Sequence, residues 1–294
     1  MKTIALIGYG KFGKKLFEKF CEYGEIKFVC KRKINNELLE LKKQFKIELS
    51  NNYNKVVEKV DLVVIATLTD SHYIIAKNCL LKEKNIFVEK PLCTTLEEAQ
   101  ELFDIAKRKN LKIYMDDVFL HRREYQKLKK LISNEKINKL RFTWKKYGTF
   151  EDSILNALVY HDMYLLIDLL EEANLENLKI LQANSPLHEN RIDILELKFK
   201  FNDMSIECLY DRTSNEKEKS LKVVTDNKIF EWKNEQILVN NQSLNFEIKN
   251  DALSIMISNL LNKKVDYEKN NLSALKSLQF IKEIENALTL QNTH

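Results

Sequence analysis

Short apolar runs alternate with helical patterns along residues 1–118, and this alternation constrains the fold more than any other feature of the sequence. The runs are TIALIG, IKFVC, DLVVIAT, NIFVEK and LKIYMDD. Short continuous apolar runs are typical of strands that are buried on both faces. Strands that alternate with helices form right-handed βαβ units around a parallel sheet. Ligands of such sheets bind at the carboxyl ends of the strands, so the residues that follow each run are the candidates for a site.

A glycine-rich loop, GYGKFG, follows the first apolar run. Gly8, Gly10 and Gly13 have the spacing G-x-G-x-x-G. The first glycine permits a tight turn, the second lets a pyrophosphate approach the backbone, and the third lets the helix pack close to the strand. The N-terminus of that helix then faces the phosphates. Between a strand and a helix, the motif predicts a dinucleotide site that also includes Lys11 and Phe12.

A basic cluster follows the second apolar run, which ends at Cys30. Its residues are Lys31, Arg32 and Lys33. Domains of this kind usually carry an acid here that binds the adenosine ribose hydroxyls, whereas basic side chains would pair with a 2′-phosphate. The cluster can also be an ordinary solvated turn. The position favours NADP over NAD and leaves both possible.

From Phe119 onward the pattern changes to long amphipathic strands, among them KLRFTWKKYG, DILELKFKF, MSIECLYDRT and KSLKVVTD. Polar turns separate them, as in a mostly antiparallel sheet with one covered face. An apolar helical stretch between the first strands carries His161 and Asp162, and two helices close the chain. We therefore predict an α/β protein with a Rossmann dinucleotide-binding domain over residues 1–118. Residues 119–294 are expected to form an α+β domain for substrate binding and oligomerisation.

Composition narrows the classes of function. Lysine and arginine number 48 against 43 acids, and the two signs are interleaved, which argues against a nucleic-acid partner. The five cysteines have no pairing or metal-ligand spacing, so we expect no metal site and a cytoplasmic location. No run approaches the ~18 apolar residues of a membrane span. One exposed face of an antiparallel sheet favours self-association, so we expect a soluble homodimer or homotetramer.

Four motifs have further meaning when they are taken together. They are the glycine loop, ATLTDSH at 66–72, VEKPL at 88–92, and a His-Asp pair at 161–162 inside a helical stretch. Together they resemble the Gfo/Idh/MocA oxidoreductases, the family of glucose-fructose oxidoreductase and inositol dehydrogenase. VEKPLCTTLEEA is the most specific of them, and the resemblance spans essentially the whole chain. It implies a dinucleotide-binding domain followed by an open antiparallel sheet backed by helices.

The resemblance also implies roles for individual residues. Lys90 is expected to reach both the nicotinamide end of the cofactor and the substrate, and His161 to exchange a proton with the reacting oxygen, although the two roles can be exchanged. His72 is expected to brace the loop near the cofactor. The motifs and the resemblance together predict the cofactor-binding residues Gly8, Gly10, Lys11, Phe12, Gly13, Lys31, Arg32, Thr67, Leu68, His72, Glu89 and Lys90. The predicted substrate-binding residues are Lys90, Asp117, Asn156 and His161, and Asp117 and Asn156 can equally be local caps.

The chain departs from the family pattern at three positions. Leu68 stands where a proline usually follows the threonine, and Asp117 stands where relatives often carry histidine or asparagine. Ala157 stands four residues before His161, where many relatives have an aspartate, and Asn156 lies beside it. These differences bear on the substrate and on activity, and leave the predicted fold unchanged.

The function that follows is an NAD(P)-dependent oxidoreductase. It would transfer a hydride between nicotinamide and a hydroxyl or carbonyl carbon of a sugar, cyclitol or nucleotide-sugar, with a protein group exchanging the proton. Two alternatives stay open: a non-catalytic, cofactor-binding regulatory protein, and an NAD-dependent glycoside hydrolase of the same fold. Arg122 and Arg123 can hold an anionic substrate or form a solvated helix face. Trp144 and Trp232 are expected to pack in the core.

Overall fold

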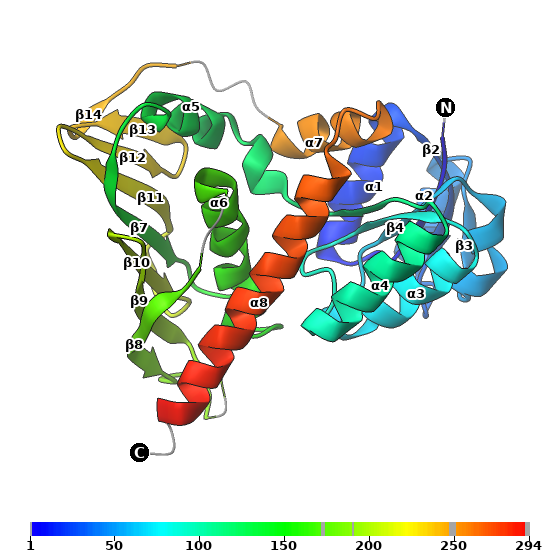
Figure 1. Cartoon of the computed structure of the whole chain (residues 1–294). Coiled ribbons are helices and arrows are strands. Elements are labelled where there is room, and N and C mark those ends of the chain that lie inside the picture. The colour runs from blue at the N-terminus through cyan, green and yellow to red at the C-terminus, as the bar shows by residue number, and fades with distance from the viewer. Residues whose placement is uncertain (1, 172–173, 190, 247–250, 292–294) are drawn as a thin grey trace. The chain divides into compact units, whose positions relative to one another are not determined.

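The computed structural model describes residues 2–171, 174–189, 191–246 and 251–291. It divides into two compact units, Met1–Val118 with Leu253–Leu275, and Phe119–Ala252 with Lys276–His294 (Figure 1). Residues 253–275, which sequence analysis assigned to the second domain, thus pack within the first unit. They come from two helices, α7 (Ala252–Leu261) and α8 (Tyr267–Gln291), and α8 contributes to both units.

The first unit contains a parallel sheet of six strands in the order β3-β2-β1-β4-β5-β6. Its strands are β1 (Thr3–Ile7), β2 (Glu25–Cys30), β3 (Glu48–Ser50), β4 (Leu62–Ile65), β5 (Asn85–Val88) and β6 (Ile113–Met115). The order reverses between β1 and β4, and in doubly wound sheets ligands bind outside the carboxyl ends at this reversal. The predicted parallel sheet is confirmed.

Helices connect these strands as the sequence pattern requires. They are α1 (Lys11–Tyr23), α2 (Asn36–Gln44), α3 (His72–Leu81) and α4 (Leu96–Arg108), with short 3₁₀ turns η1 (Tyr53–Lys55), η2 (Val57–Lys59), η3 (Thr69–Ser71) and η4 (Val118–His121). Helix α4 begins with a capping box, in which the Thr95 hydroxyl accepts from the Glu98 backbone N–H at 3.2 Å. Such a cap contributes about 1 kcal/mol of stability and fixes where the helix starts.

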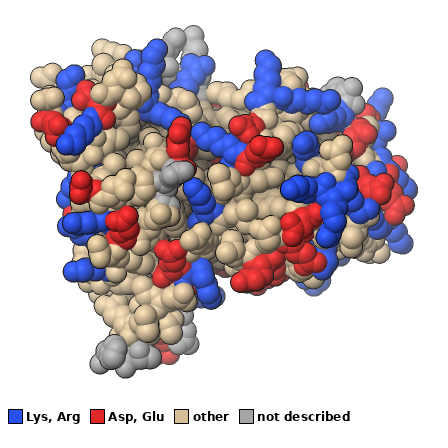
Figure 2. All heavy atoms as spheres, viewed as in Figure 1, with Lys and Arg blue, Asp and Glu red and all other residues tan. Residues whose placement is uncertain are grey.

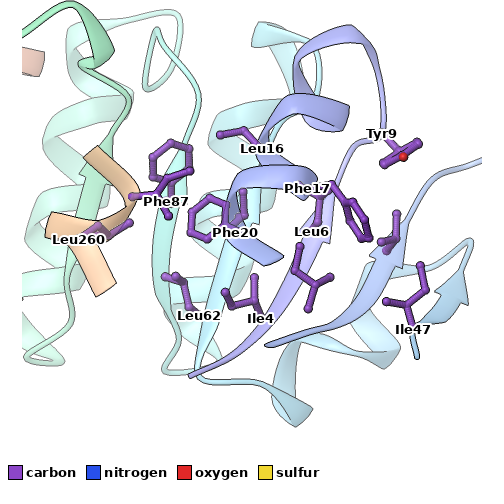
Figure 3. Packing of buried hydrophobic residues seen from close by; sticks show 14 of the residues in the cluster. Ile4, Leu6, Tyr9, Leu16, Phe17, Phe20, Ile47, Leu62, Phe87 and Leu260 are labelled. Carbon is purple, nitrogen blue, oxygen red and sulfur yellow. The ribbon is translucent and has the colours of Figure 1, made fainter. Parts of the chain in front are cut away.

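The core of the first unit lies between β1, α1 and their neighbours (Figure 3). Leu16, Phe17 and Phe20 of α1 are buried because they share one helical face. Phe20 meets Phe87 of β5 edge to face, with ring centroids 5.5 Å apart. Leu260 of α7 packs in the same cluster, which ties the returning C-terminal segment to this unit.

The second unit is built on an eight-stranded sheet, β14-β13-β12-β11-β7-β10-β9-β8. The strands are β7 (Ile137–Lys145), β8 (Glu176–Asn184), β9 (Ile194–Phe201), β10 (Met204–Asp211), β11 (Glu218–Thr225), β12 (Ile229–Lys233), β13 (Gln236–Val239) and β14 (Gln242–Ser243). Neighbouring strands are antiparallel except for β7 and β10. The predicted, mostly antiparallel sheet is therefore confirmed.

The two faces of this sheet differ in character. On β10, Ile206, Cys208 and Tyr210 are buried, while Glu207 between them pairs with lysines of β7 and β9 on the other face. The helices of this unit are α5 (Arg123–Ile132), the π-helical turn η5 (Leu155–Val159) and α6 (Tyr160–Leu170). Residues 160–168 of α6 are all buried, so this helix lies inside the unit.

The charged residues do not gather into one stripe on the visible face of the molecule. Figure 2 shows basic and acidic side chains interspersed there, which agrees with their interleaving in the sequence. Among the residues that the structure describes, no helix is long and apolar enough to span a membrane.

Candidate functional site

The glycine loop joins β1 to α1 at the reversal of strand order. Gly8 has φ +99°, and a Cβ there would lie 2.2 Å from the carbonyl oxygen of Ala66. A Cβ on Gly13 would lie 2.4 Å from the carbonyl oxygen of Gly8, whereas one on Gly10 would meet nothing within 4 Å. Two glycines are thus required by the packing of the chain on itself. Gly10 leaves open space beside the start of α1, where phosphates bind in such folds.

The other predicted residues of this loop and of the basic cluster are accessible. Lys11 and Phe12 are exposed at the start of α1, as are Arg32 and Lys33 after β2, while Lys31 is half-buried. An acid that sequence analysis did not single out, Glu37 of α2, pairs with Lys14. A hydrogen bond from Lys14 and the charge of Lys31 lower the pKa of Glu37. The end of β2 therefore presents one carboxylate among several cations.

The loop after β4 contains Thr67, Leu68 and His72. Leu68 is 67% exposed and has φ −71° and ψ 145°. His72 is buried, with Nδ1 2.8 Å from the carbonyl oxygen of Pro91 and Nε2 3.1 Å from that of Thr67. Carbonyl oxygens only accept, so the imidazolium form alone donates to both. His72 thus links the loop after β4 to the turn after β5.

Lys90 follows β5, in the segment that carries the most specific sequence motif. Lys90 is half-buried, and its peptide bond to Pro91 is cis. The preceding residue, Glu89, is buried together with Asp116, which follows β6. Burial raises the pKa of both carboxyl groups, the charge of Asp116 raises that of Glu89 further, and the charge of Lys90 opposes both shifts. Each of the two groups therefore keeps its proton to a higher pH than an exposed carboxyl group does.

Asp117, a predicted substrate ligand, is held by the protein on both carboxylate oxygens. Oδ1 accepts from the Tyr114 hydroxyl at 2.5 Å, and Oδ2 accepts from the Asn270 side chain at 3.0 Å. Asn270 lies on α8 and also bonds the backbone of Met115. These contacts give Asp117 a structural role in joining α8 to the end of β6. Asn270 lies so far along the chain that no local pattern indicated it.

His161 lies at the start of α6 in the second unit and is 8% exposed. Its Nδ1 is 3.0 Å from the hydroxyl of Tyr164, three residues on along the same helix. The Tyr164 hydroxyl also accepts from the backbone N–H of Phe119 at 3.3 Å. The imidazole stacks on Trp144, with centroids 5.3 Å apart and planes inclined at 23°. The ring is therefore held from its edge and from its face.

The helix that leads to His161 is not a regular α-helix. In η5 the N–H of Tyr160 donates to the carbonyl oxygen of Leu155, an i→i−5 bond that adds one residue to the turn. The position one turn before His161 therefore falls between Asn156 and Ala157, instead of at Ala157. Asn156 is half-buried, and its side chain donates to Asp152 Oδ1 at 3.2 Å. Because α-helical spacing leads from His161 back to Ala157, the sequence pattern alone does not place Asn156 in this way.

One residue near His161, Lys219, was not predicted. Lys219 of β11 pairs with Asp162 at 2.8 Å and lies 3.7 Å from the centroid of the Trp144 ring. Asp162 therefore has Lys219 as its ion-pair partner. Burial raises the pKa of Asp162, and the charge of Lys219 opposes that rise. Of the tryptophans expected in the core, Trp232 is fully buried and Trp144 is partly buried.

The candidate site residues thus form two groups, one in each unit. The first unit brings the glycine loop, His72, Glu89 and Lys90 to the carboxyl edge of the parallel sheet. The second places Asn156 and His161 in successive turns of one helix. Within the described ranges, no three or more His, Cys, Asp or Glu residues are grouped so that they could hold a metal ion.

Comparison with known proteins agrees with this geometry. Residues 2–116 match the family model described as an oxidoreductase family with an NAD-binding Rossmann fold. An uncharacterized oxidoreductase of Escherichia coli, YhhX, is 42% identical over 69 residues, which are 23% of this chain and 20% of that protein. The dTDP-3,4-didehydro-2,6-dideoxy-alpha-D-glucose 3-reductase of Saccharopolyspora spinosa is 25% identical over 142 residues, 47% of this chain and 43% of that protein. The matched segments therefore span less than half the length of these relatives.

The fold extends beyond the region of sequence similarity. The structure of UDP-N-acetylglucosamine 3-dehydrogenase GnnA from Acidithiobacillus ferrooxidans superposes with a TM-score of 0.87. The superposition covers 97% of both chains at 16% sequence identity. At this identity the likeness shows a shared fold over both units.

Proposed function

Residues 2–116 belong to the Gfo/Idh/MocA oxidoreductases, whose Rossmann fold binds NAD, and we propose on this premise that the chain is an NAD(P)-dependent oxidoreductase. Its substrate would carry the reacting hydroxyl or carbonyl on a sugar, cyclitol or nucleotide-sugar. The proposal rests on the open space beside Gly10, at the point where the strand order reverses. Gly8 and Gly13, in contrast, are packed closely against the backbone. Nothing in the packing of the chain requires that opening, whereas a bound pyrophosphate does.

Nicotinamide, when bound, supplies the hydride chemistry, and the chain supplies orientation and proton transfer. In this proposal Lys90 polarises and orients the substrate oxygen, and His161 exchanges a proton with it, although the two roles can be exchanged. Lys90 is supported by its place at the carboxyl end of β5, directly after Glu89, whose pKa burial raises together with that of Asp116. His161 is supported by the contacts that fix its ring on Trp144 and Tyr164.

The proposed cofactor-binding residues lie at the same edge of the parallel sheet. Gly8, Gly10, Gly13, Lys11 and Phe12 would bind the phosphates and adjoining ribose, and the loops that His72 links would line the nicotinamide end. We propose NADP as the preferred dinucleotide because basic side chains follow β2. Glu37, which lies among them, is the group that would instead favour the ribose hydroxyls of NAD.

A titration of the purified chain with NADPH and NADH, followed by cofactor fluorescence, tests this preference. Replacement of Arg32 by alanine is expected to weaken NADPH binding about tenfold, since hydrogen bonds between charged groups contribute ~1.5–3 kcal/mol. NADH binding should stay unchanged, as should both affinities in a Lys42→Ala control on the exposed face of α2. An equal loss of NADPH and NADH affinity in Arg32→Ala would mean that the basic cluster does not bind the 2′-phosphate.

For the substrate we propose a nucleotide-sugar. One relative is named a reductase of a dTDP-linked sugar, and a protein of the same fold is named a dehydrogenase of UDP-N-acetylglucosamine. Asn156 is the side chain proposed to bind the nucleotide-sugar. The extra residue in η5 brings Asn156 closer to the position one turn before His161, on the same side of the helix. Asp117, the other predicted ligand, would act through the position of β6, since its two oxygens already accept from Tyr114 and Asn270.

The reaction is tested with a panel of nucleotide-sugars and free sugars, followed by the absorbance of the reduced nicotinamide. Lys90→Met should abolish turnover while cofactor binding persists. Lys84→Met is the matched control, because Lys84 is equally half-buried but precedes β5 at the opposite end of the strand. Cofactor binding without turnover of any substrate would instead favour a regulatory protein. Release of sugar without a change in cofactor absorbance would favour a glycoside hydrolase.

The assembly and location of the protein are also proposals. The face of the eight-stranded sheet that carries Glu207 and its lysine partners would join copies of the chain into a homodimer or homotetramer. Light scattering after size-exclusion chromatography tests it, and a monomer would contradict it. A cytoplasmic location is supported by the five cysteines, all of which are free.

A further inference from the structure

A lysine ammonium lies inside an aromatic cluster of the second unit. Lys219 of β11 and Trp144 of β7 are direct cross-strand partners. The Lys219 Nζ atom is 3.7 Å from the ring centroid of Trp144, 4.4 Å from that of Phe119 and 5.9 Å from that of Trp232. Its side chain is only 14% exposed. Three rings at these distances attract a cation through their negative faces.

The same rings hold the imidazole of His161. Trp144 stacks on it at 5.3 Å, and Phe119 meets it edge to face at 4.7 Å. The counter-ion of Lys219 is Asp162, the residue that follows His161 in α6, at 2.8 Å. The ammonium therefore contacts two of the rings that touch the imidazole and the helix that carries it.

Stability alone does not account for this arrangement. A buried ion pair is often no more stabilising than apolar residues of the same shape, because both charges lose their hydration. A proton-transferring imidazole, in contrast, must keep one orientation, and neighbours that lock its rotamer maintain it. An internal cation between Trp144 and Asp162 meets that need, because it fixes a ring on the face of the imidazole and a carboxylate on its helix.

We propose that Lys219 is a positioning residue for His161, and that its ammonium, held by Asp162, fixes the indole of Trp144 on which the imidazole stacks. The catalytic consequence rests on the proposed function. Two structural features can be tested without any substrate: the Lys219 ammonium held among the three rings, here called the caged cation, and the stack of Trp144 on His161. The caged cation is tested in Lys219→Ala, which removes the atoms from Cγ to Nζ, and n-propylammonium has the same atoms.

Both tryptophans of the chain lie in this cluster, so intrinsic fluorescence reports directly on it. We expect n-propylammonium to change the emission of Lys219→Ala saturably, with n-propanol binding at least about tenfold more weakly because it lacks the charge. The wild type and a Lys222→Ala control should not respond; Lys222 lies on the same strand and pairs with Glu231. No saturable response in a folded Lys219→Ala protein would overturn the caged cation.

The positioning role is tested by the titration of His161. A protonated imidazole quenches an indole stacked on it, so the wild type should show a step in emission with pH that His161→Asn lacks. We expect the step to fall to less than about half in Lys219→Ala and to return with n-propylammonium. A step of unchanged size would overturn the positioning role.

Loss of one partner leaves Asp162 buried without its counter-ion, so Lys219→Ala is first checked by circular dichroism. If it does not fold, the double variant Lys219→Met with Asp162→Asn removes both charges and keeps the shape, and it should show the same smaller step. Once a substrate is found, the single variant should lower kcat and leave KM for the cofactor unchanged. If no substrate is found while the fluorescence results hold, the proposed function fails and the role of Lys219 in holding the ring stands.

Discussion

Gly10 and Gly13 belong to one loop but have different surroundings, which gives opposite expectations for the same substitution. Gly13→Ala would place a methyl group against the backbone of Gly8 and should cost ~1–3 kcal/mol of unfolding free energy. Gly10→Ala has open space and φ −91°, so stability should change by less than ~0.5 kcal/mol. Its dinucleotide affinity should fall at least about tenfold, because the methyl group occupies the approach of the pyrophosphate. Urea unfolding and cofactor titration of both variants check this, and unchanged affinity in Gly10→Ala would contradict the proposed binding mode.

The buried pair Glu89 and Asp116 makes stability depend on pH. Burial raises the pKa of both groups, so the folded state binds more protons than the unfolded state, and stability falls as pH rises above the unfolded values near 4. Asp116→Asn removes one of the two acids and leaves an amide that can donate to Glu89. It should raise the melting temperature relative to wild type at pH 8, with a smaller difference at pH 4. The exposed control Asp104→Asn should show no such dependence, and parallel melting curves for Asp116→Asn and wild type across pH would contradict raised pKa values in this pair.

At the scale of elements, local signals predicted some features and tertiary packing decided others. The capping box at Thr95 and the apolar run of β5 each depend on residues that are close together in the sequence, so both can be predicted. The strand β3, ELS, has no apolar run and forms because its backbone pairs with β2. The π-helical turn before His161 depends on how the buried stretch packs, and no residue type in it signals an extra residue per turn. Likewise, the contact of Lys219 with Trp144 requires the register of β11 on β7.

The loop after β4 gives a prediction at this scale. Leu68 has φ −71°, close to the value that a proline ring imposes, so the loop has a conformation at this position that proline can adopt. Leu68→Pro should therefore stabilise the protein by about 0.4–1 kcal/mol, since it restricts the unfolded chain. Leu68→Ala serves as the control for loss of an exposed leucine. Urea unfolding decides between them, and a Leu68→Pro protein less stable than Leu68→Ala would show that the loop rejects proline.

At the scale of the molecule, the change of pattern near Phe119 predicts a domain boundary, and the first compact unit includes residues up to Val118. Return of residues 253–275 to the first unit could not be predicted, because it depends on Leu260 reaching the core around Phe20 and on Asn270 reaching Asp117. These long-range contacts leave no periodic signal. They bear on function, since Asn270 and Asp117 together secure the end of β6 next to the pair that flanks Lys90.

Transfer of isotope from the cofactor to a product shows directly whether the chain catalyses hydride transfer. Purified protein would be incubated with the panel of keto-sugar nucleotides and reduced cofactor that carries deuterium at the transferable position of nicotinamide, and the products analysed by mass spectrometry. We expect one deuterium on a substrate carbon, present with wild type and Lys84→Met and absent with Lys90→Met. Cofactor binding without deuterium in any product would contradict an oxidoreductase.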